Sequence, residues 1–266
     1  MRYCFDNDLH IHSQLSSCSS DPEQTPERIL QYAKENGLKT VCLTDHFWDS
    51  AVPGASNWYQ PQDFAHISQS KPLPQAEGIR FLFGCETEMD KHMNLGISRE
   101  RFDEFDFVVI PTTHFHMVGF TIAEEDDTPE RKAKLWVEKL DALFDKDIPF
   151  RKIGVAHLAC CLMDSTSRAA NARLLDLIDE KEMERVFRRA AALGCGIEIN
   201  SDDMIFTPDE QESVLRIFRV AKRCGCKFYF GSDAHHPAWL DQAKALFDNA
   251  IDLLGLTEED RFVIGK

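Results

Sequence analysis

The chain has 266 residues, of which 43% are hydrophobic and 28% charged, a composition typical of a globular protein. Its formal net charge of -15 argues against binding to nucleic acid, because an acidic surface repels a phosphate backbone. The sequence has no apolar run near the roughly 20 residues that cross a bilayer. Residues 1–6 also lack the basic and apolar regions of a signal peptide. We therefore expect a cytoplasmic protein with no membrane partner.

Short apolar runs alternate with amphipathic stretches along the chain, which is the pattern of repeated βα units. Seven strands are predicted, at 7–11, 40–43, 80–83, 107–110, 153–156, 196–199 and 227–230. Helices are predicted over 26–36, 128–145, 170–193, 209–223 and 237–254, and residues 59–77 as a broken helix or a loop. This alternation favours one α/β domain over residues 1–266 with a mostly parallel sheet, either open or closed into a barrel.

Three of the predicted helices begin with the same signal: Thr25-Pro26-Glu27, Thr128-Pro129-Glu130 and Thr207-Pro208-Asp209. Each offers a threonine N-cap, a proline at the first helical position and an acid near the positive end of the helix. The signal predicts where helices start and says nothing about chemistry.

Residue types that bind metals follow nearly every predicted strand. In chain order they are His10 and His12, Asp45 and His46, Glu86 and Glu88, His114 and His116, His157, Glu198 and Asn200, and Asp233, His235 and His236. A single histidine in a loop is more often an ordinary hydrogen-bonded residue than a ligand. Eight of the ten histidines, however, fall at these ends. In a barrel the C-terminal ends of all strands ring one mouth, so the joint pattern predicts one metal site in a closed barrel.

The first motif places two imidazoles two residues apart. Alternation along a strand predicts that Asp8, His10 and His12 share one face, with Leu9 and Ile11 on the other. His10 and His12 could then hold one cation, with Asp8 orienting an imidazole.

The acidic residues at the next strand ends have several candidate roles. Asp45 could orient His46, bind metal or relay a proton. Glu86 is the candidate for a carboxylate that bridges two cations, and Glu88 either supports a ligand or is a solvated acid. Asp233 ends the last predicted strand two residues before His235.

Taken in order, these residues resemble the PHP family, named for polymerase and histidinol phosphatase domains. The resemblance rests on His10-Ile11-His12, Thr44-Asp45-His46, Gly84-Cys85-Glu86, His114, His157 and Asp233-Ala234-His235, and it covers essentially the whole chain. It implies a distorted seven-stranded (β/α)7 TIM-like barrel. It also implies two or three divalent metal ions, of zinc, iron or manganese, in an enzyme that hydrolyses phosphoesters.

The resemblance also implies three sets of ligands. The first metal would be held by His10, His12, Glu86 and Asp233, and the second by Glu86, His114 and His157. The third would use His46 and His235 with a ligand from the first loop. In the resemblance, Cys18 matches a position where the family has a histidine. The thiolate of Cys18 is one substitute that zinc accepts, Asp21 is another, and neither is the third alternative.

The mechanism expected from this resemblance uses a hydroxide shared by two cations about 3.5–4 Å apart, which attacks phosphorus. Asp233 or Asp45 would pass a proton to the leaving alkoxide. Arg168 and His116 are candidate contacts for the phosphate. The expected substrate is a small phosphomonoester, with histidinol phosphate as the first one to test.

Three other functions remain open. An amidohydrolase-type C–N hydrolase shares the barrel and the opening HxH motif. That family commonly places a carboxylated lysine at a middle strand end, where this chain has Pro111-Thr112-Thr113-His114. A PHP exonuclease is disfavoured by the negative charge, and a non-catalytic metal-binding regulatory domain by the complete set of ligands. Nothing in the sequence indicates the oligomeric state.

Overall fold

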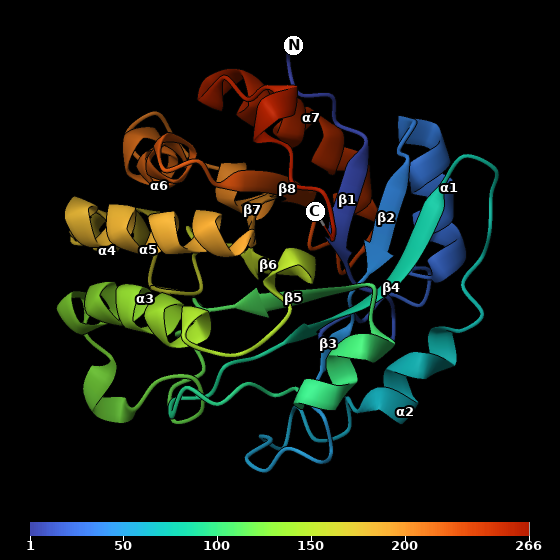
Figure 1. The fold of residues 1–266 in the computed structure, drawn as a ribbon, viewed down its shortest axis with the longest axis horizontal. Helices are drawn as coiled ribbons and strands as arrows, with labels where there is room; N and C mark the ends of the chain where they lie inside the picture. The colour runs from blue at the N-terminus through green and yellow to red at the C-terminus, as the bar shows by residue number, and fades with distance from the viewer. Residues whose placement is uncertain (266) are drawn as a thin grey trace.

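The structure, a computed structural model, describes residues 1–265 and contains a nearly closed barrel of parallel strands (Figure 1). Around the barrel the strands follow the order β1 (Asn7–Ile11), β2 (Thr40–Leu43), β4 (Arg80–Thr87), β5 (Phe107–Pro111), β6 (Ile153–Ala156), β7 (Gly196–Asn200) and β8 (Lys227–Gly231). The short strand β3 (His46–Phe47) lies off this path and pairs with the end of β4. The seven predicted strands and the TIM-like fold are therefore confirmed, while β3 was not predicted.

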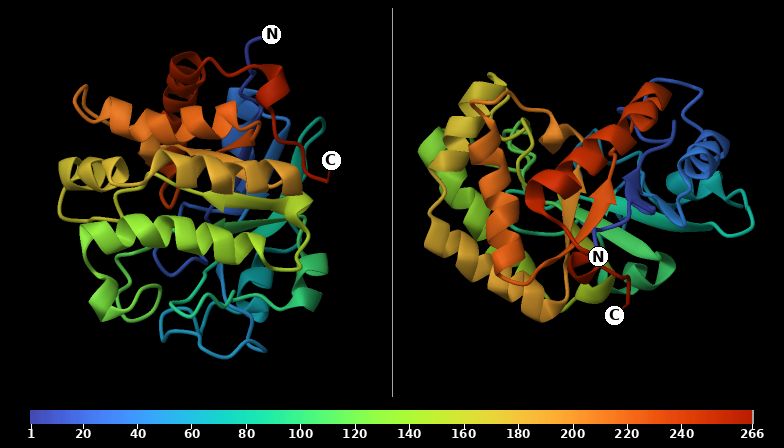
Figure 2. Two further views of the ribbon diagram at one scale, coloured as in Figure 1. Left: turned by 60° about the vertical axis from the view of Figure 1, so that its left-hand side comes forward. Right: turned by 90° about the horizontal axis from the view of Figure 1, so that it is seen from above.

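The helices lie outside the barrel (Figures 1 and 2). They are α1 (Pro26–Asn36), α2 (Phe64–Ile67), α3 (Pro129–Phe144), α4 (Arg168–Asp176), α5 (Glu180–Leu193), α6 (Gln211–Arg223) and α7 (Pro237–Leu254). Helices α3 to α6 pack against one another on one side, and α1 contacts α7 on the other. Of the uncertain stretch 59–77, only α2 and a 3-10 turn at Ser68–Ser70 are helical. In residues 1–265 we find no helix with the length and apolar character to cross a membrane.

Two predicted helix boundaries differ in the structure because of side-chain hydrogen bonds at the helix starts. Thr25 and Thr128 cap α1 and α3 as predicted. The single helix predicted over 170–193 is two helices, because Asp179 accepts hydrogen bonds from two backbone N–H groups and starts α5 anew. Thr207 caps no helix: the Glu210 carboxylate accepts a hydrogen bond from the Thr207 backbone at 2.9 Å, and α6 begins only at residue 211.

The barrel interior is apolar at one end. One buried cluster joins inward-facing side chains from six strands with a residue near the C-terminus: Leu9, Cys42, Leu82, Phe107, Val109, Ala156, Tyr229 and Phe262. The alternate strand residues belong to the larger cluster between the sheet and the helices. Because Phe262 and its neighbours fill one end of the barrel, the inward-facing polar residues collect at the other end, where the strands terminate.

A β-bulge in β1 overturns the predicted sharing of one face by Asp8, His10 and His12. Between Asp8 and Ile11 the register shifts, so that three residue steps on β1 face two on β2. Leu9 therefore joins the interior cluster beside His10, while Asp8 turns toward α1 and accepts a hydrogen bond from the Tyr32 hydroxyl at 3.1 Å. Asp8 does not orient an imidazole.

Asp8 instead joins the first strand to the last. Its carboxylate accepts a hydrogen bond from the Ser232 backbone at 3.0 Å, and Asn7 does the same for another N–H of β8 at 3.3 Å. Above them the Asp233 backbone donates to the His10 carbonyl at 2.7 Å. These hydrogen bonds hold β1 beside β8, and His10 therefore lies next to Asp233.

Candidate metal centre

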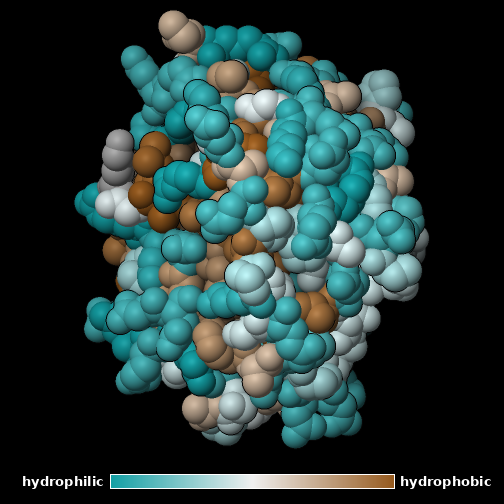
Figure 3. All heavy atoms as spheres, turned by 90° about the vertical axis from the view of Figure 1, so that its right-hand side faces the viewer, coloured by the Kyte–Doolittle hydropathy of each residue, from teal (hydrophilic) through white to brown (hydrophobic). Residues whose placement is uncertain are grey.

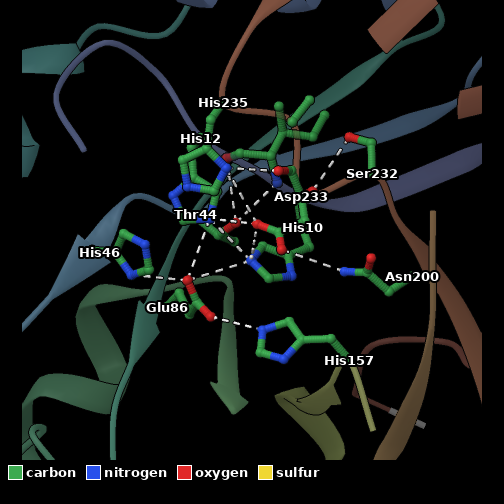
Figure 4. Close-up of polar contacts among 12 residues, drawn as sticks. His10, His12, Thr44, His46, Glu86, His157, Asn200, Ser232, Asp233 and His235 are labelled. Atoms are coloured by element: carbon green, nitrogen blue, oxygen red, sulfur yellow. Dashed lines mark hydrogen bonds and ion pairs between the residues drawn. The ribbon is translucent and has the colours of Figure 1, made fainter. Parts of the chain in front are cut away.

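Glu86, at the end of β4, lies at the centre of the polar end of the barrel (Figure 4). It is 1% exposed. Its oxygens are 2.9 Å from His46 Nδ1, 3.1 Å from His157 Nε2, 3.3 Å from His12 Nε2 and 3.5 Å from His10 Nε2. Burial works against ionisation of Glu86, but His46 and His10 hold its pKa well below the usual range. Glu86 is therefore a carboxylate that four imidazoles surround.

Asp233 completes a first group of ligand atoms with this carboxylate. Its Oδ1 is 3.1 Å from His12 Nε2 and 3.4 Å from His10 Nε2, and these two nitrogens are 3.0 Å apart. One potential ligand atom from each of His10, His12, Glu86 and Asp233 lies within 4.8 Å of the others. The four side chains that the sequence assigns to a first metal are thus brought together.

Three further groups share members with the first; one of them joins Glu198 to His10 and His157, and the other two correspond to the second and third ligand sets that the resemblance implies. Atoms of Glu86, His114 and His157 lie within 4.8 Å of one another, so Glu86 belongs to two groups as expected for a bridge. His46 and His235 form a third group with His12. That the three ligand sets bind metal ions remains a prediction.

The loop ligand expected for the third group is not among its members. Cys18 lines the cavity above the site but belongs to none of the groups of ligand atoms. Burial, with the nearby Glu86 and Asp233, raises the pKa of its thiol. The other substitute, Asp21, is paired with His236 Nε2 at 2.7 Å. Among the described residues, the third group is therefore supplied by histidines alone.

Three buried polar atoms at the centre of the site make no hydrogen bond of normal geometry: Glu86 Oε2, His46 Nδ1 and His235 Nε2, although the first two lie 2.9 Å apart. Buried polar atoms are nearly always paired, and unpaired ones are costly. All three are good ligand atoms, and a set of imidazole nitrogens and carboxylate oxygens suits zinc, iron or manganese. The residues present therefore fit the expected divalent cations.

The protonation of the histidines also follows from this crowding. Burial disfavours the charged form of His10, but Asp233, Glu198 and Glu86 outweigh it and raise its pKa well above the usual range. His235 has its pKa lowered to about 3 by burial and by the nearby His12. The carboxylates are thus stabilised by positive charge at the centre, which either protons or metal ions can supply.

An outer ring of acceptors fixes the imidazoles so that each presents its other nitrogen to the centre. The Glu198 carboxylate is 2.7 Å from His10 Nδ1, and the Glu88 carboxylate is 2.7 Å from His114 Nδ1. A carboxylate that accepts from one ring nitrogen sets the tautomer and orientation of a metal-binding histidine. Glu88, which the sequence left between two roles, is buried and supports His114.

Two hydroxyl groups belong to the same ring, and sequence reasoning missed both. Ser16 Oγ is 2.8 Å from His12 Nδ1, and Thr113 Oγ1 is 3.2 Å from His157 Nδ1. Serine and threonine carry no metal-binding signal, so only the fold could identify them. Glu198 did carry a signal, because it follows the same strand-end pattern as the predicted ligands.

Glu198 also depends on a glycine in the next strand. At Gly231 a Cβ would lie 1.9 Å from Glu198 Oε1 and 2.7 Å from His10 Cβ. Since no side-chain atom fits there, only glycine lets β8 pass this close to the carboxylate. Glu198 Oε2 in turn accepts a hydrogen bond from the His157 backbone at 2.7 Å.

Two of the predicted ligands have unusual backbone conformations. His157 has φ of 35° and Asp233 has φ of 53°, the left-handed region that non-glycine residues rarely adopt. Each follows a buried strand and turns its side chain toward the centre (Figure 4). Strain of this kind collects at functional sites, where it is held in place by the surrounding structure.

Asp45 lies behind the site. Both of its carboxylate oxygens accept hydrogen bonds at 2.7 Å, from the backbone and hydroxyl of Ser13 and from the hydroxyl of Ser16. It therefore holds the loop that carries Ser16, the partner of His12. This geometry favours a positioning role over the proton relay and the contact with His46 that the sequence suggested.

The two predicted phosphate contacts differ in position. His116 lines the cavity, and burial and the nearby His114 lower its pKa to about 4. Arg168 pairs with Asp202 at 2.9 Å and donates to the Ile205 carbonyl at 2.7 Å. It is not among the residues that line the cavity. Arg168 as a phosphate contact remains a prediction, and its guanidinium is held by Asp202 and the Ile205 carbonyl in this structure.

The site opens into a cavity of about 930 Å³, a size typical of pockets for small ligands. Its lower wall contains members of all three ligand groups, among them Glu86, His114 and His235. A closed barrel with buried histidines and carboxylates at its strand ends defines a class of proteins suited to binding divalent metals.

The chain belongs to the PHP domain family, whose model matches residues 8–262. It is 27% identical over 239 residues to a probable phosphatase of Thermoanaerobacter sp. (strain X514), covering 88% of this chain and 80% of that protein. It is 23% identical over 230 residues to a probable phosphatase of Acetivibrio thermocellus, covering 86% of this chain and 78% of that one. The resemblance found in the sequence is confirmed.

A solved structure shares the fold. It is the histidinol phosphate phosphatase of Lactococcus lactis subsp. lactis Il1403 in complex with zinc, L-histidinol and phosphate. The TM-score is 0.58 at 20% sequence identity, and the match covers 92% of this chain and 93% of that one. At this identity the likeness concerns the fold.

Proposed function

We propose that this protein is a metal-dependent phosphatase that hydrolyses a small phosphomonoester. The observation that carries the proposal is the position of Glu86, whose carboxylate belongs to two groups of ligand atoms at the bottom of one cavity. A carboxylate in that position suits two neighbouring cations, the arrangement that many phosphate-hydrolysing sites use. The probable phosphatases among its relatives, and the zinc and phosphate in its structural neighbour, support the same function.

Two or three divalent ions, of zinc, iron or manganese, would be held by the groups described above. His10, His12, Glu86 and Asp233 would hold the first, and Glu86, His114 and His157 the second. When bound, the ions would supply a water of lowered pKa as the nucleophile and would neutralise charge on the phosphate. A third ion would rest on His46 and His235 with His12, and with Cys18 if the first loop moves toward it.

The side chains have distinct tasks in this reaction. Asp233 lines the cavity, and although burial opposes its ionisation, His10 and His12 keep its pKa low. Asp233 would therefore be ionised, and it would accept a proton and pass it to the leaving oxygen. His116 is neutral near pH 7, because of its low pKa, and can donate a hydrogen bond to a phosphate oxygen.

Histidinol phosphate is the first named substrate to test, because the structural neighbour holds L-histidinol and phosphate. L-histidinol and phosphate are ligands of the neighbour, and whether this chain accepts histidinol phosphate depends on the side chains that line its own cavity.

The decisive experiment combines elemental analysis of the purified protein with hydrolysis of p-nitrophenyl phosphate. We expect zinc, iron or manganese at two or three ions per chain, loss of hydrolysis in chelator, and recovery when Zn²⁺ or Mn²⁺ is restored. Hydrolysis that persists in the metal-free protein would contradict the proposal. Release of an amine from amide substrates, with no phosphate ester hydrolysis, would favour the C–N hydrolase alternative.

A further inference from the structure

The cavity above the metal centre has a rim of exposed apolar side chains. Eight large hydrophobic side chains are exposed among the described residues, and five of them line this one cavity. They are Trp58 (38% exposed), Val118 (41%), Leu162 (37%), Ile205 (43%) and Trp239 (51%). Exposed apolar groups that gather in one place indicate a binding surface, whereas single ones need no explanation.

These five residues, called the apolar rim below, come from five different segments that follow β3, β5, β6, β7 and β8. No local sequence feature links them, so their convergence is a product of the barrel. The other three exposed large hydrophobic residues among the described residues, Met1, Leu177 and Val263, do not line the cavity. On the face drawn in Figure 3, hydrophobic residues appear in patches between hydrophilic ones. The apolar rim is therefore a local feature of the cavity mouth.

Charge is scarce around the apolar rim. The lining residues include no lysine or arginine. The acids among them are Glu86 and Asp233, which belong to the metal centre, and Asp202, which is neutralised by Arg168 at 2.9 Å. A carboxylate on the substrate would find no cation at the rim, and an ammonium would find no free anion.

Resting on the proposed function, we infer that the apolar rim binds the leaving group of the substrate, and that this leaving group is uncharged and mainly apolar. The phosphate would occupy the bottom of the cavity, and an alkyl or aryl alcohol would contact the side chains of the rim. Burying such a group against the rim is favourable by roughly 25 cal/mol for each Å² of apolar area removed from water. A positively charged leaving group would also be repelled by divalent ions at the centre. The inference therefore disfavours histidinol phosphate, whose leaving alcohol carries an ammonium, as the substrate of this chain.

The inference distinguishes two substrates that have the same reacting oxygen. In 6-aminohexyl phosphate an ammonium lies six carbons from the ester oxygen, whereas n-hexyl phosphate has a methyl group at that end, so the two leaving alkoxides are chemically alike at the reacting oxygen. We expect kcat/KM for hexyl phosphate to exceed that for 6-aminohexyl phosphate by at least about tenfold, which corresponds to about 1.4 kcal/mol. Equal values, or a preference for the amine, would overturn the inference.

A charge placed on the rim should reverse part of this preference. Leu162→Asp introduces an anion beside the path of the leaving group, and we expect it to improve 6-aminohexyl phosphate relative to hexyl phosphate at least about fivefold. Leu177→Asp is the matched control, because Leu177 is similarly exposed at 50% but lies outside the cavity, at the end of α4. A similar change in both variants would overturn the role of the rim. If Leu162→Asp does not fold, Ile205→Asp tests the same point.

Binding measurements separate this inference from the proposed function. Calorimetric titration of the metal-loaded protein with the two phosphates reports their affinities whether or not they are hydrolysed. Tighter binding of hexyl phosphate without release of phosphate would overturn the phosphatase assignment and support the rim. Hydrolysis of p-nitrophenyl phosphate with equal affinities for the two alkyl phosphates would support the phosphatase assignment and overturn the role of the apolar rim.

Discussion

The bottom and the rim of the cavity are built on opposite principles. At the bottom, His10 and Glu86 are at most 1% exposed, and hydrogen bonds and ion pairs hold the surrounding side chains in fixed orientations. At the rim, Trp239 is 51% exposed and Ile205 43%, on segments that follow the strands. Rigid strand ends position the reacting groups, while the rim can vary without disturbing them. Under the proposed function, chemistry and selectivity would be carried by separate residues of one cavity.

The difference has an energetic cause. A buried charge without partners is very unfavourable, so every acid and imidazole at the bottom needs a matching group. Apolar side chains at the rim need no partner and lose little by remaining exposed. Changes at the bottom should therefore affect metal binding and turnover together, and changes at the rim should affect the choice of substrate alone.

The largest effect is expected from Glu86→Gln. Glutamine has one carbonyl oxygen and an NH2 group that repels a cation, so it cannot serve two ligand groups at once. We expect the metal content to fall by at least one ion per chain and kcat to fall at least about 1000-fold, because metal ions contribute several kcal/mol to catalysis. Elemental analysis and turnover of p-nitrophenyl phosphate measure the two effects.

Glu77→Gln is the control for this substitution. Glu77 is exposed and lies outside the cavity, so the same chemical change there should alter neither quantity. Full metal content and full activity in the Glu86→Gln protein would show that Glu86 is not a bridge.

Lys139 tests how the bottom of the cavity is supported from behind. It lies on α3, is 1% exposed, and donates hydrogen bonds to the Met89 and Asp90 carbonyls at 2.9 and 3.4 Å, just beyond Glu88. Burial lowers its pKa from 10.5 to about 8. Between these two pH values the unfolded chain binds the proton that the folded chain has lost, so stability rises with pH.

The rise should reach about 3 kcal/mol, from the size of the shift at 1.36 kcal/mol per unit. Lys139→Met has no group to titrate and should not show this rise. The unfolding free energy of the wild type, relative to that of the variant, should therefore increase by about 3 kcal/mol between pH 8 and 10.5. Urea denaturation at several pH values measures it. Lys134→Met, an exposed position on the same helix, should show no such change. Parallel curves for Lys139→Met and wild type would contradict burial as the cause.

Glu198→Gln tests the outer ring. Both oxygens of Glu198 accept hydrogen bonds, from His10 Nδ1 at 2.7 Å and from the His157 backbone at 2.7 Å, so a glutamine must turn its NH2 toward one donor. We expect metal affinity to weaken about 10- to 100-fold, the usual effect of losing such a partner. Competition with a chelator of known affinity measures the change. Activity that recovers in excess metal identifies a positioning role, and unchanged affinity would exclude it.

The sequence predicted the bottom of the cavity well. The strand-end pattern and the resemblance singled out His10, His12, His46, Glu86, His114, His157, Asp233 and His235, and the structure brings these side chains together. Cys18 lies outside the groups, and metal binding remains a prediction. The prediction works because a parallel barrel places every C-terminal strand end at one mouth. The alternation of apolar and amphipathic stretches predicted the parallel sheet, and the polar residues at the strand ends, with the resemblance to the PHP family, predicted the barrel.

Other parts depend on contacts that no local pattern contains. The bulge in β1 turns Asp8 outward, and only the pairing of β1 with β2 reveals it. Arg168 is engaged by Asp202, 34 residues away in sequence, so a free charge could not be assumed. The apolar rim is the clearest case: its members look like ordinary hydrophobic residues until the barrel assembles their segments around one cavity.

The smallest effect is expected at the rim, from Trp239→Ala. Trp239 sits in the first turn of α7, with its ring 5.9 Å from that of His235. Removing the indole takes away part of the apolar surface for the leaving group, so kcat/KM for n-hexyl phosphate should fall about fivefold, mostly through KM, which corresponds to about 1 kcal/mol. Metal content should not change. Trp239→Phe keeps a flat apolar side chain and should recover most of the loss. A fall in metal content in Trp239→Ala would mean that the bottom and the rim are coupled and that their separation does not hold.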